Sequence, residues 1–113
     1  MNKPRNVVLL IDAFCAACGE ESEKIQKLLA GRPDLNVIGV SRDSLPAILN
    51  FKKRHQLLFP ILWDAEQKLA PDYRRVTFPT LVLVGPDKKI IQLYEGEIPA
   101  ERAEPLLRAL LGL

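Results

Sequence analysis

Residues 7–18 read VVLLIDAFCAAC, an apolar run that ends in an aromatic residue and a Cys-x-x-Cys motif. Five consecutive apolar residues, Val7 to Ile11, predict a strand that is buried on both faces, as in the middle of a parallel sheet. Cys15 and Cys18 follow where this strand gives way to a charged, helix-like stretch, residues 19–29. A Cys-x-x-Cys motif at a strand-to-helix junction is the arrangement that a dithiol/disulfide redox centre needs.

Cys15 and Cys18 are the only cysteines of the chain. A thiolate attacks a disulfide, and the free N–H groups and dipole at a helix N-terminus favour the negative charge of Cys15. We expect Cys15 to be the nucleophile and the more buried Cys18, one helical turn later, to resolve the mixed disulfide. Asp12 is a candidate proton acceptor for Cys18; a solvated acid at the end of the strand is the alternative, and both stay open.

The rest of the chain predicts an α/β fold of order βαβαβαββα, with a mixed sheet of about five strands, helices on both faces and one antiparallel edge hairpin. The predicted strands are residues 7–11, 37–40, 60–63, 80–84 and 90–94, and the predicted helices are residues 20–29, 43–55 (with Asp43 or Ser44 as its cap), 64–73 and 99–111. Catalytic groups in such sheets gather at the carboxyl ends of the parallel strands, where Cys15 and Cys18 fall.

Phe78, Pro79 and Thr80 form the second informative motif, at the beginning of the fourth predicted strand. A proline at this position invites a cis peptide bond, and an ordinary trans proline that begins an edge strand is the alternative. A cis turn beside the dithiol would leave the backbone of Phe78 free to pair with an extended substrate segment. We therefore expect these three residues, together with Phe14, to face the substrate.

The composition narrows the classes of function. A length of 113 residues fits one domain over residues 1–113. A net charge of only +2, with acids and bases interspersed, does not favour nucleic acid or an anionic membrane as a partner. The apolar runs are too short to span a membrane. The basic start before Val7 does not read as a signal peptide, so we expect a cytoplasmic location, or an exported or membrane-tethered one if a signal has been removed.

These motifs together resemble the thioredoxin superfamily, and within it the TlpA-like and AhpC/TSA-like branch of thiol–disulfide oxidoreductases. Phe14 stands where this family has an aromatic residue, Pro79 matches its cis-proline, Gly96 matches a glycine that ends the last strand, and residues 59–76 resemble its strand–helix insert. Ala16 and Ala17 depart from the family, which often has a proline between the cysteines.

The resemblance implies a thioredoxin-like fold and an enzyme that exchanges its dithiol with disulfides of a partner protein. It implies an upstream redox partner for electron transport, no metal or organic cofactor, and a monomer. The direction of electron flow is not readable from the motif, because known dithiol potentials span about 150 mV.

Two alternative functions stay open. Cys18-Gly19-Glu20-Glu21 fits the second half of the peroxiredoxin pattern Thr-x-x-Cys-x-x-Glu, but Cys15 occupies the threonine position, and the arginine that polarises peroxide would fall near Pro79 instead. A metal-binding module is the other alternative. One Cys-x-x-Cys supplies only two of the four ligands of a structural zinc site, and His55, the only histidine, is predicted to be solvated near the end of a helix.

Overall fold

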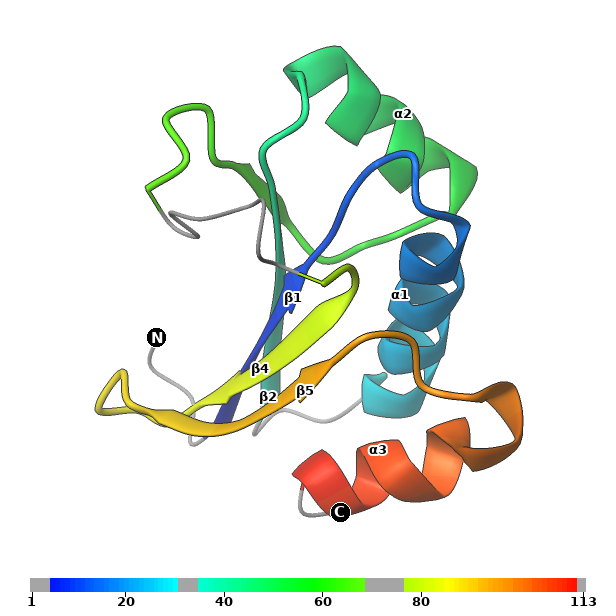
Figure 1. The fold of residues 1–113 in the computed structure, drawn as a ribbon, viewed down its shortest axis with the longest axis vertical. Coiled ribbons are helices and arrows are strands. Elements are labelled where there is room, and N and C mark those ends of the chain that lie inside the picture. The colour runs from blue at the N-terminus through cyan, green and yellow to red at the C-terminus, as the bar shows by residue number, and fades with distance from the viewer. Residues whose placement is uncertain (1–4, 31–34, 69–76, 112–113) are drawn as a thin grey trace.

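The computed structural model describes residues 5–30, 35–68 and 77–111 of the chain, and it contains one five-stranded sheet of order β3-β2-β1-β4-β5 (Figure 1). The strands are β1 (Arg5–Leu10), β2 (Leu35–Ser41), β3 (Ile61–Trp63), β4 (Thr80–Val84) and β5 (Ile90–Glu95). β1, β2 and β3 are parallel, whereas β4 is antiparallel to both β1 and β5. The predicted antiparallel hairpin of β4 and β5 at the edge of the sheet is confirmed. Antiparallel pairing also extends to the central strand, because β4 is antiparallel to β1.

Three α-helices pack on this sheet: α1 (Ala16–Leu29), α2 (Leu45–Arg54) and α3 (Ala103–Leu111). All three lie on one side of the sheet in Figure 1. The placement of α1 and α2 follows from topology, because the β1-α1-β2 and β2-α2-β3 connections progress in the same direction and right-handed crossovers then use the same face. The predicted closing helix is divided into a 3₁₀ turn, η2 (Ala100–Arg102), and α3.

The helix predicted over residues 64–73 is wrong for residues 64–68, and residues 69–73 lie outside the described part of the chain. The part that is described is a turn, in which the backbone and carboxylate of Asp64 accept hydrogen bonds from the N–H groups of Gln67 and Lys68. Helical cover on the second face of the sheet therefore stays a prediction.

The hydrophobic core lies between the sheet and the helices. Val7 and Leu9 of β1 and Ile25 of α1 are completely buried, while Val8 and Leu10, which point to the other face, are half-buried. This alternation shows that β1 is less buried on its second face than five apolar residues in a row predict. The strand that is buried along its whole length is β4.

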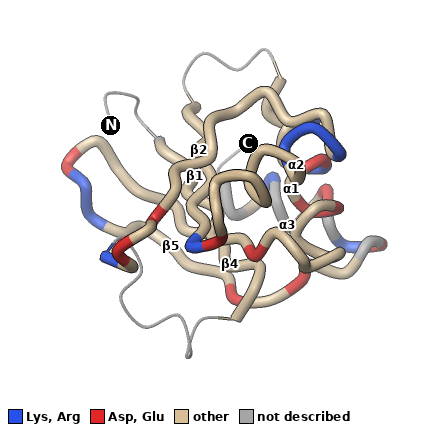
Figure 2. Tube along the Cα trace, turned by 90° about the horizontal axis from the view of Figure 1, so that it is seen from above, with Lys and Arg blue, Asp and Glu red and all other residues tan. Residues whose placement is uncertain are grey.

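The charged side chains have both signs and are spread along the chain (Figure 2). Lys52, Lys53 and Arg54 stand together in the last turn of α2, where positive charge is favoured by the helix dipole. Among the described residues, none of the helices is long and apolar enough to cross a membrane.

Candidate active site

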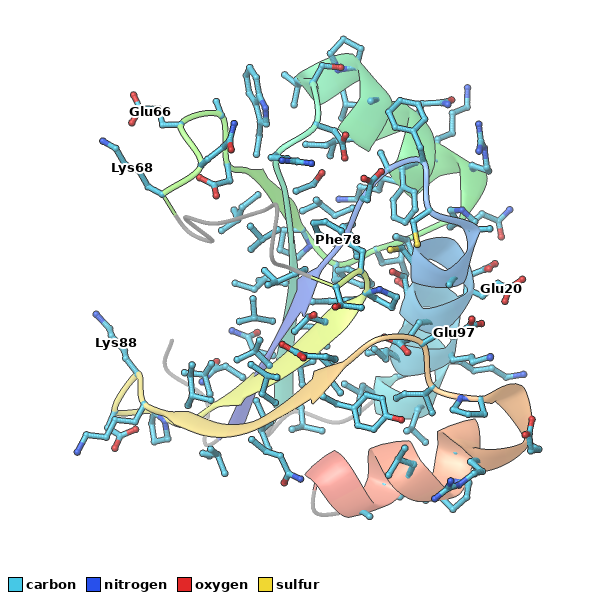
Figure 3. All side chains as sticks on the ribbon, viewed as in Figure 1. Glu20, Glu66, Lys68, Phe78, Lys88 and Glu97 are labelled. Carbon is cyan, nitrogen blue, oxygen red and sulfur yellow. The ribbon has the colours of Figure 1, made fainter. Side chains whose placement is uncertain are left out.

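Cys15 is the N-cap residue of α1, as predicted. Its backbone is extended, and its sulfur accepts a hydrogen bond from the N–H of Cys18 at 3.2 Å. The thiols of Cys15 and Cys18 are also in hydrogen-bond contact with each other. Both cysteines are free thiols; Cys15 is half-buried and Cys18 is buried. Figure 3 shows the two sulfur atoms next to each other at the N-terminal end of α1.

Burial raises the pKa of the Cys18 thiol well above its ordinary range. A hydrogen bond from the backbone of Asp12 acts in the opposite direction, and the neighbouring thiol of Cys15 and the charge of Asp12 raise the pKa further. Cys18 therefore stays protonated at neutral pH in this arrangement. A buried, protonated thiol behind a half-exposed one suits the order of attack in which Cys15 reacts first.

Asp12 lies beside the dithiol, but its polar groups hold the loop before α1. Its carboxylate accepts a hydrogen bond from the N–H of Phe14 at 2.8 Å, and its carbonyl oxygen accepts one from the N–H of Cys15 at 3.1 Å. These bonds form a local turn of the kind that aspartate favours. The proposed transfer of a proton from Cys18 to the Asp12 carboxylate stays a prediction.

The residues expected to face the substrate differ in their exposure. Phe14 is 84% exposed and Phe78 is half-buried, whereas Pro79 and Thr80 are buried. The Phe78–Pro79 peptide bond is cis, the carbonyl oxygen of Pro79 accepts a hydrogen bond from Gly96, and the hydroxyl of Thr80 donates to the carbonyl oxygen of Thr77. Of the four, only Phe14 and Phe78 therefore present side-chain surface to a partner, and Phe78 lies toward the dithiol end of the sheet in Figure 3.

Asp43 belongs to the site, although the sequence predicted it only as a possible helix cap. Ser44 caps α2 instead, by accepting a hydrogen bond from the N–H of Ala47. The carboxylate of Asp43 accepts a hydrogen bond from the N–H of Ala13 in the dithiol loop. The sequence signal that could have found this contact is an acid two residues after the end of a strand that neighbours β1 in a parallel sheet.

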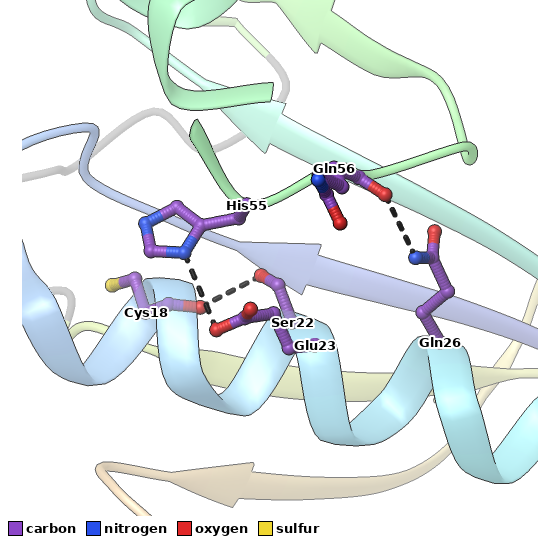
Figure 4. A network of polar contacts seen from close by, with 6 residues as sticks. All are labelled: Cys18, Ser22, Glu23, Gln26, His55 and Gln56. Atoms are coloured by element: carbon purple, nitrogen blue, oxygen red, sulfur yellow. Dashed lines mark hydrogen bonds and ion pairs between the residues drawn. The ribbon is translucent and has the colours of Figure 1, made fainter. Parts of the chain in front are cut away.

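Two further contacts hold the flank of α1 (Figure 4). His55, which the sequence predicted to be solvated, packs its ring where a Cβ of Gly19 would stand, and its Nδ1 lies 3.3 Å from the carboxylate of Glu23. The amide of Gln26 donates to the carbonyl oxygen of Gln56 at 3.0 Å and accepts from the N–H of Leu58 at 2.6 Å.

Glu21, the glutamate of the Cys18-x-x-Glu21 half of the peroxiredoxin pattern, is a buried acid on the same helix. One of its carboxylate oxygens accepts a hydrogen bond from the N–H of Ile98, and the other has no hydrogen-bond partner among the described residues. Burial raises the pKa of this carboxyl, and the nearby charge of Glu97 raises it further, against the opposing effects of the Ile98 hydrogen bond and Lys24. Within residues 5–30, 35–68 and 77–111, no group of three or more His, Cys, Asp or Glu side chains could hold a metal ion.

Residues 2–93 match the model of the AhpC/TSA family. Among curated proteins, the chain is 28% identical over 98 residues to the thiol-disulfide oxidoreductases ResA of Bacillus thuringiensis subsp. konkukian and of Bacillus cereus. These alignments cover 84% of the chain but 57% of each relative, so the chain spans little more than half the length of the curated relatives it matches.

Solved structures give the same fold. A secreted Mycobacterium tuberculosis disulfide oxidoreductase homologous to Escherichia coli DsbE matches with a TM-score of 0.79 at 20% identity, covering 97% of this chain and 82% of that one. Peroxiredoxin Q of Xanthomonas campestris matches with 0.78 at 20% identity, over 98% and 80%. StoA of Bacillus subtilis matches with 0.74 at 21% identity, over 94% and 84%. The predicted thioredoxin-like α/β fold is confirmed.

Proposed function

The chain belongs to the AhpC/TSA family within the thioredoxin superfamily, and from this membership we propose that it is a thiol–disulfide oxidoreductase that exchanges its Cys15–Cys18 dithiol with disulfides of partner proteins. The observation that carries the proposal is the pair of thiols at the head of α1, where a half-exposed sulfur contacts a buried one. Its similarity to the ResA oxidoreductases supports the same activity.

The reaction proceeds in two exchanges. The Cys15 thiolate attacks one sulfur of the partner disulfide, a mixed disulfide forms, and the other partner sulfur leaves as a thiolate that takes up a proton. Cys18 then loses its proton, with Asp12 as the candidate acceptor, and attacks the sulfur of Cys15. The Cys15–Cys18 disulfide forms and the partner leaves with two electrons. The raised pKa of Cys18 suits this order, because its proton is lost only when the second step begins. An upstream redox partner restores the dithiol by the reverse exchanges.

The partner is a protein whose chain passes Phe14 and Phe78 as it brings its disulfide to Cys15. These two aromatic residues offer apolar surface, whereas Pro79 and Thr80 are buried and the carbonyl oxygen of Pro79 is bonded to Gly96, so their substrate-facing role stays a prediction. We propose that the protein acts as a monomer. The predicted cytoplasmic location stays a prediction, and the structural relative described as secreted supports an exported setting as the alternative.

Reduction of a protein disulfide, such as those of insulin, tests this function. We expect Cys15→Ser to lose at least about 100-fold in rate, because no nucleophile remains at the head of α1. Cys18→Ser should instead accumulate a mixed disulfide on Cys15, which intact-mass measurement detects. Ala16→Ser is the matched control, since it adds a hydroxyl at an exposed neighbouring position without removing a thiol. Unchanged turnover by Cys15→Ser would refute the proposal.

The peroxidase alternative predicts a different result. It requires Cys18 to attack a peroxide, but Cys18 is buried and its pKa is raised, and both features disfavour that role. Peroxide consumption that persists in Cys15→Ser and is lost in Cys18→Ser would favour the peroxidase over the oxidoreductase.

A further inference from the structure

The loop between β1 and α1 is held by a carboxylate that comes from a different strand. Oδ2 of Asp43, which follows β2, accepts a hydrogen bond of 2.8 Å from the N–H of Ala13, a residue 30 positions away in the sequence. The N–H groups of Phe14 and Cys15 bond within the loop, to the carboxylate and the carbonyl oxygen of Asp12. The Ala13–Asp43 bond therefore ties the loop that carries the dithiol to the neighbouring strand.

Asp43 is itself held in place. The hydroxyl of Ser41, a completely buried residue at the end of β2, donates a 2.7 Å hydrogen bond to the same oxygen, Oδ2, and accepts one from the backbone N–H of Asp43. Hydrogen bonds to a carboxylate are short and strong, and a carboxylate whose orientation is fixed positions its partner accurately. The orientation of the loop thus depends on the end of β2 and not on the loop alone.

The position of this loop determines the environment of both thiols. Ala13 lies between Asp12, whose backbone hydrogen-bonds to Cys18, and Phe14, which directly precedes Cys15 in the sequence. If the Ala13 N–H loses its acceptor, the loop that holds Asp12 and leads into Cys15 loses a constraint on its position. Misplacement by about 1 Å can lower the rate of a positioned reaction by about 100-fold.

We propose that Asp43, oriented by Ser41, is a positioning residue of the dithiol, which sets the reactivity of Cys15 and the redox equilibrium of the Cys15–Cys18 pair without touching a substrate. This inference rests on the proposed thiol–disulfide function. It assigns Asp43 the role of a hydrogen-bond acceptor and not that of a charge. Both donors converge on one oxygen, so the single carbonyl oxygen of an asparagine can accept both bonds.

Four variants test the proposal: Asp43→Ala, Asp43→Asn, Ser41→Ala and, as the matched control, Asp87→Ala. Asp87 accepts a comparable hydrogen bond from the N–H of Lys89 in the turn between β4 and β5, at the other end of β4 from Pro79. The measurements are the rate constant for exchange with a small aromatic disulfide from pH 5 to 9, the reduction potential against glutathione, and the rate at which iodoacetamide alkylates Cys15. Each variant's unfolding transition is recorded alongside.

We expect Asp43→Ala to lower the exchange rate about tenfold, to shift its pH profile and to move the redox equilibrium, with Ser41→Ala between it and the wild type. Asp43→Asn should stay within about threefold of the wild type, because its side-chain oxygen still accepts both hydrogen bonds. This result would show that the loss in Asp43→Ala comes from the missing acceptor. Wild-type behaviour in Asp43→Ala, or an equal loss in Asp43→Asn, would overturn the positioning role. A wild-type protein that does not exchange disulfides would refute the proposed function instead, and the alkylation rates would still decide whether Asp43 positions Cys15.

Discussion

Two loops hold the helix that carries the thiols, and they hold it in different ways. The loop before α1 is fixed by hydrogen bonds from its own backbone N–H groups to Asp12 and Asp43. The loop after α2, residues 55–58, is fixed from the flank of α1 by side chains of that helix, above all Gln26. The first arrangement fixes the orientation of the backbone N–H groups near the sulfur atoms. The second fixes the position of α1. We therefore expect changes at the flank to alter stability and to leave thiol reactivity unchanged.

Gly19→Ala should have the largest effect of the flank variants. A Cβ at this position would lie 2.2 Å from two ring atoms of His55, so the ring must move away from Glu23 and from Phe51, whose ring centroid is 4.8 Å away. Overpacking of this kind costs about 1–3 kcal/mol, against a gain of about 1 kcal/mol from helix propensity. We expect a net loss of up to about 2 kcal/mol in the free energy of unfolding, measured by urea denaturation.

His55→Ala provides the control for that measurement. In its background the Gly19→Ala change meets no ring and should raise the free energy of unfolding by about 0.5–1 kcal/mol. The same sign of the Gly19→Ala effect in both backgrounds would contradict the contact. A changed alkylation rate of Cys15 without a change in stability would contradict the separation of the two loops.

Gln26→Ala should have a smaller effect, because both of its hydrogen bonds are exposed and water replaces part of what is lost. We expect about 1 kcal/mol less stability and an unchanged rate of disulfide exchange. Gln26→Glu is a useful comparison, since it keeps an acceptor for the N–H of Leu58 and removes the donor to Gln56. A rate that falls in step with stability in both variants would show that the flank also controls the chemistry.

Glu21→Gln should have the smallest effect and a characteristic dependence on pH. Its carboxyl has a raised pKa in the folded protein, so the folded state binds this proton more tightly than the unfolded chain does. The free energy of unfolding therefore falls as the pH rises from the ordinary pKa of a glutamate through the raised value, and the loss persists above it. The glutamine variant lacks this loss, so denaturation should find it more stable than the wild type at pH 8, by less than about 1 kcal/mol, and the difference should shrink toward pH 5. A difference that grows as the pH falls would contradict the burial of an ionised Glu21.

The elements that follow from local pattern were predictable. The bounds of β4 agree with the prediction because Pro79 and Gly85 delimit it, and Cys15 was expected in the N-cap region of α1 because its motif follows a strand directly. The contacts between segments that are distant in the sequence were not predictable. The Ala13–Asp43 bond and the packing of His55 on Gly19 join segments that approach each other only through the crossover geometry of the sheet. Local spacing therefore finds the reacting atoms, and tertiary packing selects the residues that support them.

The sulfur of Cys15 caps the N-terminus of α1 and is also the proposed nucleophile. A thiolate accepts the N–H of Cys18 well, whereas a sulfur already bonded to another sulfur is a weak acceptor. We therefore expect bond formation with a partner to weaken this hydrogen bond at the N-terminus of α1 just before Cys18 attacks Cys15. A serine at position 15 would keep the helix terminus intact, since a hydroxyl is among the best groups there. The inactive Cys15→Ser protein should consequently melt no earlier than the active one, and its loss of turnover then reports chemistry and not unfolding.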